Sequence, residues 1–164
     1  MNPRAALGVA MGSAALATAS ITATGQWEGL ELTAYPDRLA RNIPTACYGE
    51  TLGIKLGMTF TKPECDDKLA SALLRHWNGI EACYPAIKDL PGGQKIAHLD
   101  LSYNIGINAW CRSSIPKLLA QGEQMGACSK TLQFTMSMGK WIRGLFNRRT
   151  FFIDYCEGRL WRPD

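Results

Sequence analysis

The stretch Trp27–Thr51, WEGLELTAYPDRLARNIPTACYGET, decides how this chain folds and contains its most informative side chains. The 23 residues 5–27 carry no charge, and the first charged residue after them is the acid Glu28. Its β-prone runs, LTAY and IPTACYG, are broken by Gly and Pro, which predicts a short helix around residues 27–32 followed by a small antiparallel hairpin. Four carboxylates lie within it, and they are Glu28, Glu31, Asp37 and Glu50.

Two of these carboxylates are candidates for glycosidic-bond hydrolysis. Such a reaction needs a protonated acid on the leaving oxygen and a second carboxylate that acts on water or on the sugar. Glu28 stands beside Trp27, where desolvation favours a protonated acid, and Asp37 follows Tyr-Pro in a hydrated turn. The alternative is that Glu28 and Glu31 only favour a helix amino terminus and that Asp37 only forms a turn. Spacing alone leaves both interpretations open.

Upstream, residues 5–24 form an uncharged segment that is long enough to span a bilayer but only weakly apolar. Eight alanines, two glycines and five Ser or Thr residues dilute five strongly apolar side chains. A cleavable signal peptide, a permanent anchor and a weak anchor that later leaves the membrane are all compatible with this composition. Arg4 before the segment and Glu28 after it predict an inside amino terminus and an outside body. Gly8 and Gly12 form a G-x-x-x-G pair, a pattern typical of helix dimerisation.

Downstream of the hairpin the sequence becomes helical. Thr61 and Glu64 form a capping box, and Leu69, Leu73 and Trp77 then repeat on one face. Further helices are expected over 93–103, with Ile96, Leu99 and Tyr103 inward, after a Ser114 cap as far as Gly122, and over 145–157. We therefore expect an α+β fold, with a small β-containing amino-terminal lobe and a larger helical carboxyl-terminal lobe.

Cysteine spacing and charge narrow the possible functions. The six cysteines lie at least 17 positions apart, which disfavours a zinc site and suits disulfides in an oxidising compartment, although free buried thiols remain an alternative. No acid occurs between Glu123 and Asp154, and the cations of that stretch suggest a basic face for an anionic polysaccharide, lipid or nucleic acid, or merely a solvated helix face. Those cations are Lys130, Lys140, Arg143, Arg148 and Arg149.

Five ordered motifs resemble the phage lysozymes of glycoside hydrolase family 24, and in particular the signal-anchor-release endolysins of lambdoid phages. They are EGLELTAYPD, TACYGET, FTKPEC, YNIG and GLFNRR. The resemblance implies a lysozyme-like domain over residues 26–164 and a signal-anchor-release segment over residues 1–25. It also implies a muramidase that cleaves the β-1,4 bond between N-acetylmuramic acid and N-acetylglucosamine and lyses the host cell for phage release.

The same resemblance implies roles for individual residues. Glu28 matches the general acid, Asp37 the carboxylate that acts on water, and Thr45 the threonine that holds this water, with inversion as the usual outcome. Asn104 falls where the family lines its sugar-binding cleft, and Arg148 matches a basic residue near the acid. The loop between Asp37 and Thr45, RLARNIP, is longer than is common in relatives, so the hairpin must bulge or lengthen.

The resemblance further implies partners and location. We expect peptidoglycan as substrate, no cofactor, no metal and no nucleic acid, and a monomer when active. Residues 5–24 would hold the protein on the host inner membrane, amino terminus inside, before release to the periplasm. Cys83 and Cys111 look like an addition to the relatives' four cysteines, which suggests that they pair.

Two rival functions remain. One is a non-enzymatic membrane-disrupting protein that acts through its cationic, aromatic carboxyl third, around Trp141, Phe146, Phe151 and Phe152. The other keeps the fold but cleaves by transglycosylation, which leaves an anhydro-muramic product.

Overall fold

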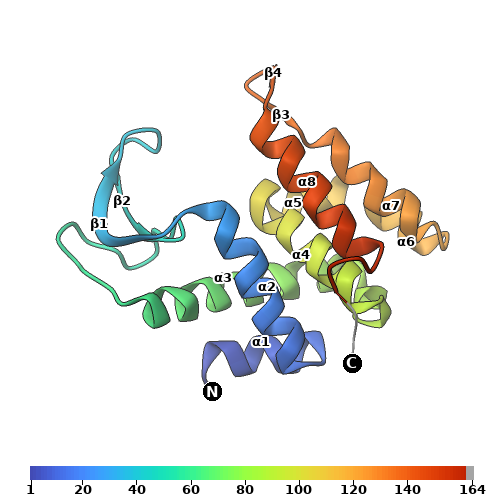
Figure 1. The fold of residues 1–164 in the computed structure, drawn as a ribbon, viewed down its shortest axis with the longest axis horizontal. Helices are drawn as coiled ribbons and strands as arrows, with labels where there is room; N and C mark the ends of the chain where they lie inside the picture. The colour runs from blue at the N-terminus through green and yellow to red at the C-terminus, as the bar shows by residue number, and fades with distance from the viewer. Residues whose placement is uncertain (162–164) are drawn as a thin grey trace. The chain divides into compact units, whose positions relative to one another are not determined.

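The computed structural model describes residues 1–161 and has an α+β fold with a helical majority and two small sheets (Figure 1). The chain divides into two compact units, residues 1–74 and the remainder from Arg75, which are described separately. The helix α3, Lys62–Cys83, begins in the first unit and ends in the second.

The first unit opens with two helices, α1 (Pro3–Met11) and α2 (Ala14–Glu28). Gly12 ends α1 in the left-handed conformation, φ 87°, and the Ser13 hydroxyl caps α2 by accepting from the N–H of Ala15. The prediction of a short helix around residues 27–32 is therefore wrong, because α2 ends at Glu28 and is followed by Gly29 with φ 72°. The alanine-rich segment has high helix propensity and simply continues the helix as far as this glycine.

The weakly apolar segment belongs to the first unit, and four of its five strongly apolar side chains are buried. Leu7, Met11, Leu16 and Ile21 are all buried. Gly8 lets α1 approach α2, since an added Cβ there would lie 3.1 Å from the Cα of Ala14. Among the described residues no single helix is both long and apolar enough to cross a membrane; α1 and α2 meet those limits only as a pair, bent by 112°.

The pair β1 (Glu31–Asp37) and β2 (Ile43–Cys47) forms the expected antiparallel hairpin. Beneath it, Ala34, Ala46 and Ile54 form a small apolar core, against which Phe60 packs. The capping box that starts α3 is also confirmed: Thr61 N–H donates to Glu64 Oε2 over 2.7 Å, and Glu64 N–H donates to Thr61 Oγ1 over 3.4 Å. Leu69, Leu73 and Trp77 are buried, as the helical repeat predicts.

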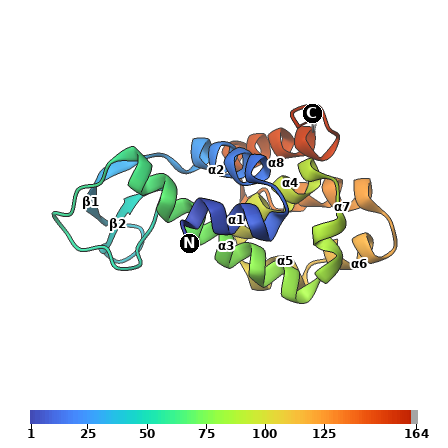
Figure 2. The same cartoon turned by 90° about the horizontal axis from the view of Figure 1, so that it is seen from below.

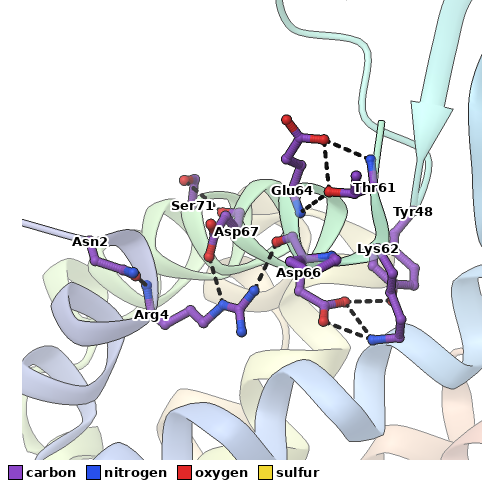
Figure 3. Close-up of polar contacts among 10 residues, drawn as sticks. Asn2, Arg4, Tyr48, Thr61, Lys62, Glu64, Asp66, Asp67 and Ser71 are labelled. Carbon is purple, nitrogen blue, oxygen red and sulfur yellow. Dashed lines mark hydrogen bonds and ion pairs between the residues drawn. The ribbon is translucent and has the colours of Figure 1, made fainter. Parts of the chain in front are cut away.

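Polar contacts fasten the amino terminus to α3 (Figure 3). The Arg4 guanidinium pairs with Asp67 at 2.6 Å and donates to the carbonyl of Pro63 at 2.8 Å. At the adjacent position of α3, Lys62 and Tyr48 both donate to Asp66, each at 2.7 Å. Arg4, the charge expected to orient the segment in a membrane, thus contacts α3 in the folded protein.

In the described part of the second unit, helices predominate and one short hairpin joins β3 (Met136–Ser137) to β4 (Lys140–Trp141). Its longer helices, α4 (Gly92–Ile105) and α8 (Arg143–Cys156), lie side by side (Figures 1 and 2). Ile96 and Leu99 are fully buried on α4, whereas Tyr103 is only partly buried. The shorter helical segments are α5 (Ile107–Arg112), α6 (Ile115–Ala120), α7 (Gln124–Lys130), η1 (Pro85–Asp89) and η2 (Thr131–Gln133).

All six cysteines are disulfide-bonded, as their spacing predicted. Cys47–Cys65 joins the hairpin to α3 within the first unit. Cys83–Cys111 and Cys128–Cys156 lie in the second unit, and the first of these is the pair that the family resemblance suggested.

Candidate active site

Glu28 is the last residue of α2 and lies half-buried three positions before Glu31, where β1 begins. Gly29 turns the chain from helix to strand with a positive φ that other residues rarely adopt. This junction places the candidate acid in the same unit as the hairpin.

Asp37 and Thr45 lie on the same face of the hairpin. Tyr35 pairs with Thr45 and Asp37 pairs with Ile43, so Asp37 and Thr45 are diagonal neighbours across the two strands. Such diagonal Cβ atoms stand about 7–8 Å apart or somewhat closer. The lengthened loop is accommodated in the turn, where Arg41 and Asn42 adopt left-handed conformations. The extra residues therefore do not push Thr45 to the opposite face.

Hydrogen bonds orient both of these side chains. The N–H groups of Leu39 and Ala40 donate to Asp37 Oδ1 over 2.9 and 3.3 Å. The Thr45 hydroxyl donates to the carbonyl of Ile43 over 3.0 Å, and Thr45 is only 3% exposed. A hydroxyl that donates to the backbone keeps its lone pairs available as acceptors.

The other two acids of the stretch Trp27–Thr51 are Glu31 and Glu50. Glu31 is exposed on β1, opposite Cys47. Glu50 accepts from the N–H groups of Thr51 and Leu52 over 3.0 and 2.9 Å, and thereby stabilises the turn after β2.

In the second unit, Arg148 forms a buried, bidentate ion pair with Asp100. Its Nε and Nη2 donate to the two carboxylate oxygens over 3.0 and 2.6 Å, and both side chains are at most 5% exposed. A planar guanidinium fits a carboxylate in this two-bond geometry. Sequence reasoning missed Asp100, because a single acid within an apolar helix gives no sign of its partner on α8.

Asn104 lines a pocket of about 530 Å³ in the second unit. Its side-chain oxygen accepts from Arg149, which also donates to the carbonyl of Phe134 over 3.2 Å. The pocket combines polar groups with apolar ones, and its other lining residues are Ile105, Gln133, Met136, Ser137 and Leu145. This mixture suits a ligand that has both hydroxyl groups and apolar ring faces.

The basic face expected in the carboxyl third is only partly present. Arg148 and Arg149 are 4% and 1% exposed and contact Asp100, so neither contributes to a solvated cationic surface. Phe152 is buried as well, whereas Trp141 and Phe146 are exposed. The pattern of charges in sequence could not reveal that Asp100 neutralises this part of α8.

Comparison with known proteins identifies relatives over nearly the whole chain. The phage lysozyme family model matches residues 25–151. The SAR-endolysin of Enterobacteria phage P21 is 34% identical over 163 residues, which cover 96% of this chain and 95% of the relative. The SAR-endolysin of Enterobacteria phage PA-2 is 33% identical, with the same coverage of 96% and 95%.

A solved structure has the same fold at a similar length. The endolysin of the Escherichia coli O157:H7 phage FAHEc1 superposes with a TM-score of 0.74 at 25% identity, over 88% of this chain and 94% of that one.

Proposed function

The chain belongs to the phage lysozyme family, and we propose that it hydrolyses the β-1,4 bond between N-acetylmuramic acid and N-acetylglucosamine. That it is a glycosidase of the lysozyme type acting on peptidoglycan follows from the family itself. The bond, the catalytic residues and the route to the periplasm are our proposal.

Glu28 acts as the general acid in this mechanism. Its carboxyl proton passes to the glycosidic oxygen as the bond to the anomeric carbon breaks. Water attacks the opposite face of the sugar, and Asp37 accepts the proton that this water loses. Inversion requires the two carboxyl groups to lie roughly 6.5–9.5 Å apart, with water between them. The half-buried position of Glu28 and its location in the same unit as Asp37 support this division of roles.

Thr45 holds the attacking water through a free lone pair of its hydroxyl. The observation that carries the proposal is the strand register, which sets Thr45 diagonal to Asp37 on one face of the hairpin. In the second unit, Asn104 and its pocket would bind the sugar chain. The ion pair between Arg148 on α8 and Asp100 on α4 stabilises the helix that carries Asn104. Arg148 is therefore a positioning residue in this proposal.

Residues 1–25 act as a signal-anchor-release segment in this proposal, and residues 26–164 as the muramidase domain. Two relatives bear the name SAR-endolysin, and the segment here is weakly apolar. The segment would first hold the protein on the host inner membrane, with the body in the periplasm. The active protein would then be a monomer whose α1 and α2 are packed as described above.

The products of digestion test the proposed reaction. Mass spectrometry of fragments released from purified peptidoglycan should show muramic acid at a reducing end, with one water added for each bond cleaved. Anhydro-muramic ends would instead show transglycosylation and contradict hydrolysis. Killing of cells without release of any sugar fragment would favour the membrane-disrupting alternative, which the burial of Arg148, Arg149 and Phe152 makes less suitable.

A further inference from the structure

His98 is a buried histidine that the proposed reaction does not use. It lies on α4 with 0% exposure, and within the described residues neither ring nitrogen has a hydrogen-bond partner. Its ring packs edge-on against Trp110, with the ring centroids 5.8 Å apart. An unsatisfied buried polar group is destabilising, so a leucine would be the simpler residue for this position.

The neighbours of His98 are two sulfur atoms. Cys128 on α7 and Cys156 on α8 are both buried, and each ligand atom of the three residues lies within 4.8 Å of the others. In the structure the two sulfurs form a disulfide. Once that bond is opened, the same three side chains offer one imidazole nitrogen and two thiolates to a common point.

We propose that the dithiol form of this cluster binds a single Cu⁺ ion through His98, Cys128 and Cys156. Thiolates are soft ligands that favour Cu⁺, and imidazole also suits copper. Zinc in structural sites almost always takes four protein ligands, whereas the cluster has three among the residues that the structure describes. Donors bound to one metal at about 2.0–2.3 Å stand closer together than 4.8 Å but farther apart than two bonded sulfurs. Opening the disulfide therefore lets the two sulfurs separate from 2.10 Å, and a small inward movement of the His98 ring completes the site.

Metal binding and disulfide formation exclude each other in this site. On binding, the two thiols release two protons, and the neutral imidazole contributes a lone pair without losing a proton. On oxidation, the two thiolates give two electrons to an external disulfide, which takes two protons from solvent and becomes two thiols. The sulfurs then join, and the copper leaves as Cu⁺. The cluster therefore holds copper only before the Cys128–Cys156 bond forms or after it is reduced.

The test uses the full chain, reduced with a phosphine under argon and titrated with Cu⁺ from its coloured bicinchoninate complex. The matched control is Cys83→Ser with Cys111→Ser, because that pair has the same sequence separation of 28 as Cys128–Cys156 but no histidine grouped with it in the described part of the chain. The control should retain the tightest site. His98→Leu, and separately Cys128→Ser with Cys156→Ser, should weaken it by at least about tenfold.

X-ray absorption at the copper edge provides a second measurement. Wild type and the Cys83→Ser/Cys111→Ser control should show scattering from an imidazole ring, and His98→Leu should show sulfur scattering alone. The far-ultraviolet circular dichroism of oxidised His98→Leu should match wild type, which separates loss of a ligand from loss of the fold. Equal copper affinity in wild type and His98→Leu, including the case in which the reduced chain unfolds, would overturn the proposal. So would the absence of imidazole scattering in wild type.

Discussion

At the scale of single residues, the catalytic roles of Glu28, Asp37 and Thr45 stay predictions. The spacing of Glu28, Asp37 and Thr45 could be read from the sequence, and the strand register now places Asp37 and Thr45 on one face. The end of the helix on which Glu28 lies could not be read correctly, because Trp27 and Glu28 suit a helix start as well as a helix end. The role of Asp100 could not be predicted either, because it depends on the ion pair with Arg148, 48 positions away in sequence.

His98 makes the stability of the protein depend on pH. Burial lowers its pKa from 6.5 to about 4, so the unfolded chain binds a proton between these values and the folded chain does not. The free energy of unfolding should therefore rise with pH in this window and fall as pH drops below about 6.5. Between about pH 7 and pH 5 the expected loss is about 2 kcal/mol.

Urea unfolding at these two pH values measures the effect. His98→Leu should show a much flatter dependence, with a residual slope of the same sign from His76, whose pKa burial also lowers. An unchanged slope in His98→Leu would show that other groups set the pH dependence.

At the scale of elements, two long helices of the second unit were predictable because apolar repeats and helix propensity are local signals. The expected Ser114 cap is wrong in one respect, because its side chain makes no capping hydrogen bond to α6. The expected helix over 93–103 is α4, two residues longer at its end and one at its start. The expected helix over 145–157 is α8, which starts two residues earlier and ends one earlier. How closely these helices approach was not predictable, because it depends on glycines whose partners lie far away in sequence.

Gly93 sets the approach of α4 to α8. An added Cβ at Gly93 would lie 2.0 Å from the carbonyl oxygen of Tyr155, which belongs to the backbone and cannot rotate away. Gly93→Ala should therefore lower the free energy of unfolding by about 1–3 kcal/mol or more. Gly144→Ala is the matched control, because nothing lies within 4 Å of its added Cβ and alanine is the better helix former. Thermal unfolding of the two variants measures the difference, and equal unfolding temperatures would contradict this account.

At the scale of the whole molecule, cysteine spacing predicted disulfides and composition predicted a weakly apolar amino-terminal segment. Neither could show that this segment is bent and buried in the folded protein. The bend depends on Gly12 and Ser13, which end α1 and cap α2, and the burial depends on contacts with residues far along the chain, such as Arg4 with Asp67. The G-x-x-x-G pair likewise has a role within one chain, since Gly8 packs against Ala14 and Gly12 forms the break.

Gly12→Leu with Ser13→Leu should trap the protein in the membrane. The change removes the left-handed glycine and the helix cap, so α1 and α2 can join in one straight helix of higher hydropathy. Fractionation of cells that express the variant should find it in the membrane, with delayed lysis. Arg4→Gln, which leaves the bend intact, is a useful comparison and should not increase retention. Unchanged release of the double variant would contradict the proposed weak anchor.

The most direct measurement of the central claim is the release of reducing ends from purified peptidoglycan by Glu28→Gln and Glu31→Gln. The two acids are three positions apart, but Glu28 is half-buried at the end of α2 whereas Glu31 is exposed on β1. Loss of the general acid should slow release by about 10²–10⁴-fold in Glu28→Gln. Glu31→Gln should work at nearly the wild-type rate. Equal release by Glu28→Gln and wild type would contradict the assignment of the acid.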